Sequence, residues 1–277
     1  MHIKALALDL DGTALMPDNT LGQRTVKILR ELIARGIQII FCTGRAIEAA
    51  EQYRAAIGAE GAMVFFNGAE VVDVPSGKIL SANLLDLEVV EFGIDMARNM
   101  GLHYQIYLPP GGGKYEALLV DRPTPEAEMY HSHTGIRPIV KNLKEAIGMP
   151  GLQGCIKAMF ICDPEYHDEI RKKLLDRFGQ TIYVARTYAT FLEIMNAGVS
   201  KGEGLKIVMK HRGLDAKELI ALGDEENDLL MFDAVGFSAA PANAREKVKA
   251  AADYVFGSNA EEGIAAFLED KFLKRTL

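Results

Sequence analysis

The chain has 277 residues, of which 49% are hydrophobic and 25% are charged, and its formal net charge is −7. This composition is normal for a globular protein that fills one large domain or two modest ones. The acidic balance excludes a broad basic surface for nucleic acid or for an anionic membrane, and no apolar run approaches the length that spans a bilayer.

The start of the chain and its cysteines indicate the compartment. The chain opens directly into a strand-like run, with no signal-type apolar region before it. Its three cysteines, Cys42, Cys155 and Cys162, are odd in number and match no zinc spacing. We therefore expect buried, reduced thiols in a soluble cytoplasmic protein. The oligomeric state stays open between a monomer and a homodimer.

The first segment alternates strand-like and helix-like patterns. Thr20 and Gln23 fit a capping box at the start of a helix that stops at Gly36. Strands that alternate with helices at short spacing favour a parallel sheet with helices on both faces. The expected elements are a strand over 3–10, a helix over about 20–36, a strand over 37–42, a helix to about 57 and a strand over 63–66.

The pattern changes between about 83 and 193, where short strands and helices no longer alternate regularly. Pro109 to Gly113 has the composition of a hairpin loop, and Asp163 with Pro164 predicts the start of a helix. This segment is typical of a smaller α+β domain. The expected elements are a helix over 86–100, strands over 103–108, 115–120 and 156–162, a helix to 178, and strands over 181–185 and 190–195.

Strand–helix alternation resumes after 194, with a helix over 200–213, a strand over 218–222 and a helix over 225–234. We therefore predict an α/β fold with a doubly wound, Rossmann-like parallel-sheet core. Residues 1–82 and 194–277 would form this core, and residues 83–193 would form an inserted α+β domain.

Two carboxylates follow the first predicted strand, in the run Asp9-Leu10-Asp11-Gly12-Thr13. Side chains two residues apart share one face of a strand, so we expect both carboxylates to look into one pocket. Like charges that close need a cation or a shared proton at neutral pH. A solvated turn is the plainer interpretation of the same residues.

Three further motifs stand at strand ends or helix starts. Thr43-Gly44-Arg45 follows the second strand and offers a hydroxyl and free N–H groups to an anion, or a helix cap. Ser200 and Glu203 fit a capping box that puts Lys201 in a first helical turn, where a cation needs an anionic neighbour unless it is solvated. The fourth motif, Gly223 to Asp228, follows the strand over 218–222, and its acidic residues could serve only the helix dipole.

The four motifs are expected to converge. In a doubly wound sheet, ligands bind beyond the carboxyl ends of the strands, which is where all four motifs stand. A cluster of carboxylates suits a hard cation, and Mg²⁺ is the one that accompanies phosphate. The residues predicted to meet there are Asp9, Asp11, Asp224 and Asp228, with Thr43 and Lys201 alongside.

The order DLDGT, TGR, SKG and GDEEND resembles the four motifs of the haloacid dehalogenase superfamily of phosphatases. Asn67-Gly68-Ala69 and the mid-chain insert are similar to its Cof-type branch, and the resemblance covers essentially the whole chain. It implies a Mg²⁺-dependent phosphatase of small phosphorylated metabolites, with sugar phosphates first. It also implies an aspartyl-phosphate intermediate and an insert that acts as an α/β cap.

The resemblance also implies roles for individual residues. Asp9 would be the nucleophile and Asp11 the general acid/base. Glu225 stands where the family often has Asn, which adds negative charge near the metal. Mg²⁺ would be held by Asp9, Asp224 and the backbone carbonyl of Asp11, supported by Asp228 and Asn227. The phosphoryl group would be held by Thr43, Gly44, Lys201 and Asn227. Possible substrate contacts are Arg45, Asn67, Lys114 and Arg186.

Some interpretations stay open at this point. Lys114 and Arg186 could instead be solvated surface cations. A phosphomutase would return the phosphoryl group to a bound sugar, and release of free phosphate would exclude it. A receiver-like signalling module also combines Asp, Thr and Lys around Mg²⁺, but such modules are usually shorter and lack a mid-chain insert.

Overall fold

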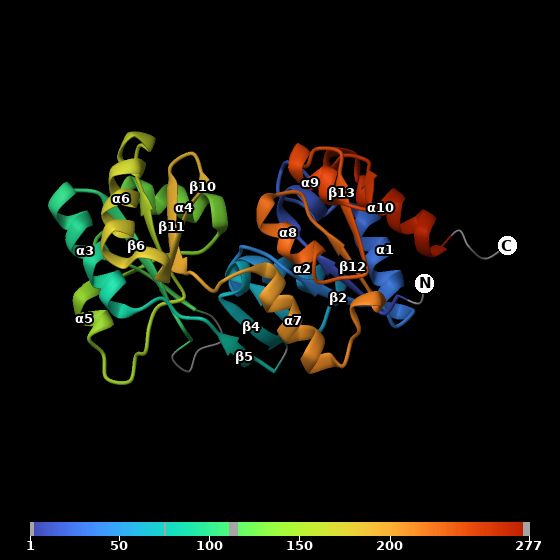
Figure 1. Ribbon diagram of the computed structural model, residues 1–277, viewed down its shortest axis with the longest axis horizontal. Coiled ribbons are helices and arrows are strands. Elements are labelled where there is room, and N and C mark those ends of the chain that lie inside the picture. The colour runs from blue at the N-terminus through green and yellow to red at the C-terminus, as the bar shows by residue number, and fades with distance from the viewer. Residues whose placement is uncertain (1–2, 75, 111–115, 274–277) are drawn as a thin grey trace. The chain divides into compact units, whose positions relative to one another are not determined.

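The computed structural model describes residues 3–74, 76–110 and 116–273, which divide into two compact units (Figure 1). The first unit comprises residues 1–45, 50–81 and 200–277, and the second comprises residues 46–49 and 82–199. A parallel sheet dominates the first unit and a mostly antiparallel sheet the second, so the predicted fold class is confirmed.

Five parallel strands form the main sheet of the first unit, in the order β14-β13-β12-β1-β2. Leu8 of β1 pairs with Leu222 of β12 on one side and with Phe41 of β2 on the other. These three strands therefore end at the same level. The strands are β1 (Ala5–Leu8), β2 (Gln38–Phe41), β12 (Leu219–Leu222), β13 (Phe237–Pro241) and β14 (Tyr254–Phe256).

Helices connect these strands and bury apolar faces against them. A cluster that includes Ile40 of β2, Ala221 of β12 and Leu205 of α7 forms a core in this unit. The strand order reverses between β1 and β12, which is where ligands bind in open α/β sheets. The helices are α1 (Gln23–Ala34), α2 (Ile47–Ile57), α7 (Lys201–Arg212), α8 (Leu229–Phe232), α9 (Glu246–Ala251) and α10 (Gly263–Leu268).

A small three-stranded sheet extends the first unit. It consists of β3 (Gly61–Phe65), β4 (Glu70–Val74) and β5 (Lys78–Ala82). The strand predicted at 63–66 exists as β3, but it pairs antiparallel with β4 and meets β2 through a parallel bridge between Cys42 and Val64. The hairpin of β4 and β5 was not predicted. Its turn uses Gly77, which has φ of 70° and donates its N–H to the Asp73 carbonyl.

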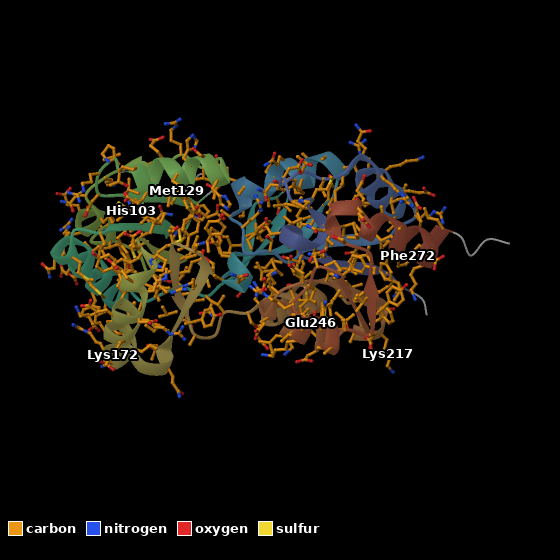
Figure 2. The ribbon with its side chains drawn as sticks, turned by 90° about the horizontal axis from the view of Figure 1, so that it is seen from above. His103, Met129, Lys172, Lys217, Glu246 and Phe272 are labelled. Atoms are coloured by element: carbon orange, nitrogen blue, oxygen red, sulfur yellow. The ribbon has the colours of Figure 1, made fainter. Side chains whose placement is uncertain are left out.

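The second unit has a six-stranded sheet in the order β10-β11-β9-β6-β7-β8. Val90 and Ile94 of α3 and Ile170 of α6 pack with Ile106 and Phe160 of the sheet. Charged side chains such as Lys172 of α6 project outward in Figure 2. The strands are β6 (His103–Leu108), β7 (Ala117–Val120), β8 (Ile139–Val140), β9 (Lys157–Ile161), β10 (Ile182–Tyr188) and β11 (Phe191–Asn196), and the helices are α3 (Leu87–Met100), α4 (Pro125–Thr134), α5 (Leu143–Ile147) and α6 (His167–Phe178).

Two helix starts differ from the predictions. Helix α1 begins at Gln23 after Gly22, and Thr20 instead donates its N–H and hydroxyl to Asp18. The first turn of α1 is satisfied from far along the chain, because the Glu262 carboxylate accepts the N–H and hydroxyl of Thr25. The capping box predicted for Thr20 is therefore wrong.

The second difference lies at α6. Asp163 has the position of an N-cap, as predicted, but a short 3-10 turn at Pro164–Tyr166 separates it from α6. Within the described part of the chain, the Asp163 side chain makes no capping hydrogen bond.

The cysteines are buried and free of disulfides, as expected. Burial raises the pKa of Cys155 to about 12 and that of Cys162 to about 11, which makes both thiols poor nucleophiles. None of the described helices combines the length and the apolar character that crossing a membrane requires.

Candidate active site

Parallel register brings the first and fourth motifs to one edge of the main sheet. Asp9 follows β1 directly, and its N–H donates to the carbonyl of Leu222, the last residue of β12. Asp224 follows β12 after one glycine. Both aspartates therefore flank the point where the strand order reverses.

Three carboxylates form a buried cluster at this edge. One oxygen each from Asp9, Asp224 and Asp228 lies within 4.8 Å of the others. The three residues are only 4%, 8% and 0% exposed. Burial, then repulsion from Asp228, raises the pKa of Asp224 to about 6. Burial likewise raises the pKa of Asp9 well above its usual range, despite the lowering effect of Lys201. Burial and the neighbouring carboxylates therefore disfavour the ionised forms of Asp9 and Asp224.

Lys201 provides a buried cation beside the cluster. Its Nζ atom donates to Asp9 Oδ1 at 2.6 Å and to Asp228 Oδ1 at 2.7 Å. Burial would lower the pKa of Lys201, but Asp228 and Asp9 outweigh that effect and raise it. Ser200 caps α7 through the N–H of Glu203, as predicted, and so fixes Lys201 in the first turn. Asp9 and Asp228 are thus the anionic neighbours that were expected for a buried lysine at this position.

Short hydrogen bonds orient the two aspartates after β12. Asp228 Oδ2 accepts the N–H groups of Asp224 at 2.9 Å and Glu225 at 3.0 Å. Thr13, whose role was not predicted, donates its hydroxyl to Asp224 Oδ1 at 2.8 Å. Both carboxylate oxygens of Asp228 therefore accept hydrogen bonds within the protein, and Asp224 Oδ1 accepts one from Thr13.

Gly12 permits the close approach between the first and fourth motifs. Its φ is 75°, and a Cβ atom at this position would lie 2.3 Å from Asp224 Oδ2. A side chain here would meet both a strained backbone and a carboxylate. The glycine is thus required by the approach of Asp224 as well as by the turn.

Asp11 has a different environment from Asp9. The strand ends at Leu8, and the turn over Leu10–Ala14 is irregular, with an extended backbone at Asp11 (φ −73°, ψ 126°) and a positive φ at Gly12. The Asp11 side chain is 51% exposed and forms an ion pair with Arg45. Asp9 is thus buried and Asp11 half-exposed, but the charge of Asp11 contributes to the raised pKa of Asp9 after burial and the other aspartates, and their sharing of one pocket stays a prediction.

Thr43 and Asn67 connect the second motif to the third strand. Thr43 is fully buried, its carbonyl accepts the Asn67 N–H, and its hydroxyl accepts the Arg45 N–H at 3.1 Å. Asn227 Nδ2 donates to Asn67 Oδ1 at 3.0 Å. A Cβ atom on Gly44 would lie 3.1 Å from Asn67 Oδ1, so the backbone passes close to this amide. These residues form one hydrogen-bonded group.

The structure describes one of the two substrate contacts that were predicted in the insert. Arg186 Nε donates to His167 Nδ1 at 3.0 Å within the second unit, and burial followed by the charge of Arg186 lowers the pKa of His167. Lys114 lies outside the described residues.

Comparison with known proteins gives the family. The family model of haloacid dehalogenase-like hydrolases matches residues 6–268, so the chain belongs to this family. A Haemophilus influenzae protein with a provisional phosphatase name is 32% identical over 98% of each chain. HMP-PP phosphatase of Cronobacter sakazakii is 28% identical and covers 95% of this chain and 93% of its own.

A solved structure gives the same result. A haloacid dehalogenase-like hydrolase from Bacteroides thetaiotaomicron superposes with a TM-score of 0.88 at 26% identity, covering 98% of this chain and 100% of that one. The predicted superfamily and the predicted hydrolase class are thereby confirmed.

Proposed function

We propose that the chain is a Mg²⁺-dependent phosphatase of small phosphorylated metabolites, with sugar phosphates as the first candidates, and that Asp9 is its nucleophile. The observation that most directly supports this proposal is the buried group of Asp9, Asp224 and Asp228, which lies beside Lys201 at the sheet edge. The family of hydrolases, and the HMP-PP phosphatase name of one relative, support the reaction class.

The donor set fits a hard divalent cation. All three clustered groups are carboxylates, and burial, followed by repulsion from neighbouring carboxylates, raises the pKa values of Asp9 and Asp224. Asp9 and Asp224 would hold Mg²⁺ directly, with the Asp11 carbonyl. Asp228, whose oxygens bond to Lys201 and to backbone N–H groups, would support them. When bound, Mg²⁺ would supply positive charge to the phosphoryl oxygens.

The protein residues would then divide the chemistry. An Asp9 oxygen attacks phosphorus, the bond from phosphorus to the leaving oxygen breaks, and Asp11 gives that oxygen a proton. Water next attacks the phosphorus of the phosphorylated Asp9, Asp11 takes a proton from this water, and inorganic phosphate leaves. Lys201 would neutralise negative charge, because phosphoryl transfer depends mainly on positioning and charge stabilisation.

The other motif residues would hold the phosphoryl group before and during the reaction. Thr43 and Asn227 are candidates because they hydrogen-bond to Asn67, and Gly44 is one because its backbone passes close to the Asn67 amide. Asn67 itself is a possible substrate contact. Its φ of 56° is unusual for a residue other than glycine, which is consistent with a functional constraint on this turn.

We further propose that residues 83–193 form a cap that selects the substrate. Arg186→Ala and Lys114→Ala should change the ranking of substrates and spare Mg²⁺ affinity, because specificity is a difference in transition-state binding between substrates. An unchanged ranking for both variants would assign recognition to other residues.

A phosphate-release screen tests the proposed function. The panel should hold sugar phosphates, nucleotides, pyridoxal phosphate, flavin mononucleotide and HMP-PP, each assayed with Mg²⁺ and with excess chelator. We expect free phosphate from at least one compound, loss of release in chelator, and no release by Asp9→Asn. Full activity in chelator, or in Asp9→Asn, would contradict the proposal. Transfer to the substrate without free phosphate would indicate the mutase.

A further inference from the structure

Arg45 forms two hydrogen bonds to the Asp11 carboxylate. Arg45 Nε donates to Asp11 Oδ2 at 2.9 Å, and Arg45 Nη2 donates to Asp11 Oδ1 at 2.6 Å. A two-point bond of this kind fixes both the position and the plane of a carboxylate. Arg45 is the anchored partner, because its side chain is 14% exposed whereas that of Asp11 is 51% exposed.

The Arg45 guanidinium is itself held from two sides. It lies over the ring of Tyr53 in α2, with 5.2 Å between its central carbon and the ring centroid. Its Nη2 atom lies 3.4 Å from Asn19 Oδ1, and the Tyr53 hydroxyl donates to the Asn19 carbonyl at 2.8 Å. The backbone N–H of Arg45 donates to Thr43. Tyr53 and Asn19 thus hold the Arg45 guanidinium in place, and the guanidinium in turn holds the Asp11 carboxylate.

We infer that Arg45 is a positioning residue for Asp11, and that it acts on the reaction through Asp11 and not as a contact of the substrate. The inference rests on the proposed function, in which Asp11 is the general acid/base. The turn of Leu10–Ala14 leaves Asp11 outside the regular strand, and Gly12 beside it gives the backbone extra freedom. The two hydrogen bonds from Arg45 nevertheless restrict the Asp11 carboxylate to one orientation.

The inference predicts a specific kinetic signature for Arg45→Ala. A misplaced Asp11 slows phosphorylation of Asp9 only for substrates whose leaving oxygen needs a proton, whereas the later attack of water is the same step for every substrate. The first step is therefore read from kcat/KM. With an alkyl phosphate such as a sugar phosphate, kcat/KM should fall roughly 10- to 100-fold, the scale expected for misplacing a catalytic group by about 1 Å. With p-nitrophenyl phosphate, whose leaving group departs unprotonated, kcat/KM should fall less than about threefold.

A double-mutant cycle separates positioning from substrate contact. In the Asp11→Asn background, Arg45→Ala should lower kcat by less than about twofold, because residues that act as one unit are not additive. Arg98→Ala is a matched control, since Arg98 makes the same two-point pair with Asp121 in the second unit, at 2.9 and 3.0 Å. It should leave the ratio of the two kcat/KM values unchanged. Tyr53→Leu, which removes the ring under Arg45, should shift the ratio in the same direction as Arg45→Ala.

The possible failures are distinguishable. If the wild-type chain releases no phosphate from any substrate, the proposed function fails and the inference fails with it. If the wild-type chain is active and Arg45→Ala lowers kcat/KM equally for both leaving groups, only the inference is overturned. Full additivity with Asp11→Asn would overturn it in the same way. If circular dichroism shows that Arg45→Ala does not fold, Arg45→Lys replaces it. Lysine keeps the charge but cannot form the two-point bond, so this variant should lose kcat/KM with the alkyl phosphate and not with p-nitrophenyl phosphate.

Discussion

Lys201 Nζ lies 2.6 Å from Asp9 Oδ1, which joins the first turn of α7 to the end of β1 across 192 residues of sequence. Both side chains are almost fully buried, at 2% and 5% exposure. Since Asp228 contacts the same ammonium, one buried cation holds together three segments of the first unit.

Removing this cation should destabilise the fold. Lys201→Met keeps the length of the side chain and removes its charge, which leaves buried carboxylates without their partner. We expect the free energy of unfolding of the metal-free protein at neutral pH to fall by about 3–5 kcal/mol, the usual cost of breaking a buried ion pair. Urea unfolding measures this difference.

A control for Lys201 lies on the same helix. Lys206 pairs with Glu203 at 2.7 Å, but both side chains are exposed, at 58% and 61%. Exposed pairs contribute less than about 1 kcal/mol, so Lys206→Met should have a small effect. Equal stability of the two variants would contradict the structural role given to Lys201.

Gly12 and Gly36 provide a matched pair for the role of the opening motif. Their φ values are 75° and 85°, but a Cβ atom would clash with Asp224 at Gly12 and would meet nothing within 4 Å at Gly36. Alanine should cost about 1–2 kcal/mol of backbone strain at either site. Only Gly12→Ala should also weaken Mg²⁺ binding, measured by calorimetry, because it displaces Asp224. Similar Mg²⁺ affinity in both variants would count against Asp224 as a ligand.

The raised pKa of Asp224 predicts how Mg²⁺ stabilisation depends on pH. The folded value is about 6 and the unfolded reference is 3.8, so between these pH values the metal-free folded state binds more protons than the unfolded chain. The stability of the metal-free protein should therefore fall as pH rises from about 4 to about 6. Mg²⁺ needs ionised carboxylates, so its binding strengthens over the same range.

The measurement is the rise in Tm on adding Mg²⁺ at about pH 5 and about pH 7. We predict a clearly larger rise at the higher pH, and Asp224→Asn should lose most of that difference. An equal rise at both pH values would show that Asp224 does not have to release a proton to bind the ion.

Much of this architecture could be predicted because it is encoded locally. The apolar runs before Asp9 and Gly223 are strands in the structure, and the N-cap predicted at Ser200 placed Lys201 in the first helical turn correctly. The described residues show only this half of the predicted capping box, because the Glu203 side chain accepts from Lys206. The meeting of Asp9 with Asp224 followed from the geometry of parallel sheets, in which neighbouring strands end at one edge.

The rest depends on contacts between distant residues. Glu262 satisfies the first turn of α1 from 237 residues away, and no pattern near Thr20 could reveal it. The bond between Asp11 and Arg45, 34 residues further on, was not predicted, because it depends on how distant segments meet in the tertiary structure. Thr13 belongs to the opening motif, but its bond to Asp224 depends on tertiary structure.

The central claim is that Asp9 carries the phosphoryl group during turnover, and trapping the phosphorylated enzyme tests it most directly. Asp11→Asn should accumulate this species with p-nitrophenyl phosphate and Mg²⁺, because the first step then needs no acid and the second lacks its base. After an acid quench and peptide mass spectrometry, we predict one phosphoryl group on Asp9, and none in a variant that also carries Asp9→Asn. A phosphoryl group on another residue, or turnover by Asp9→Asn at the wild-type rate, would contradict the account.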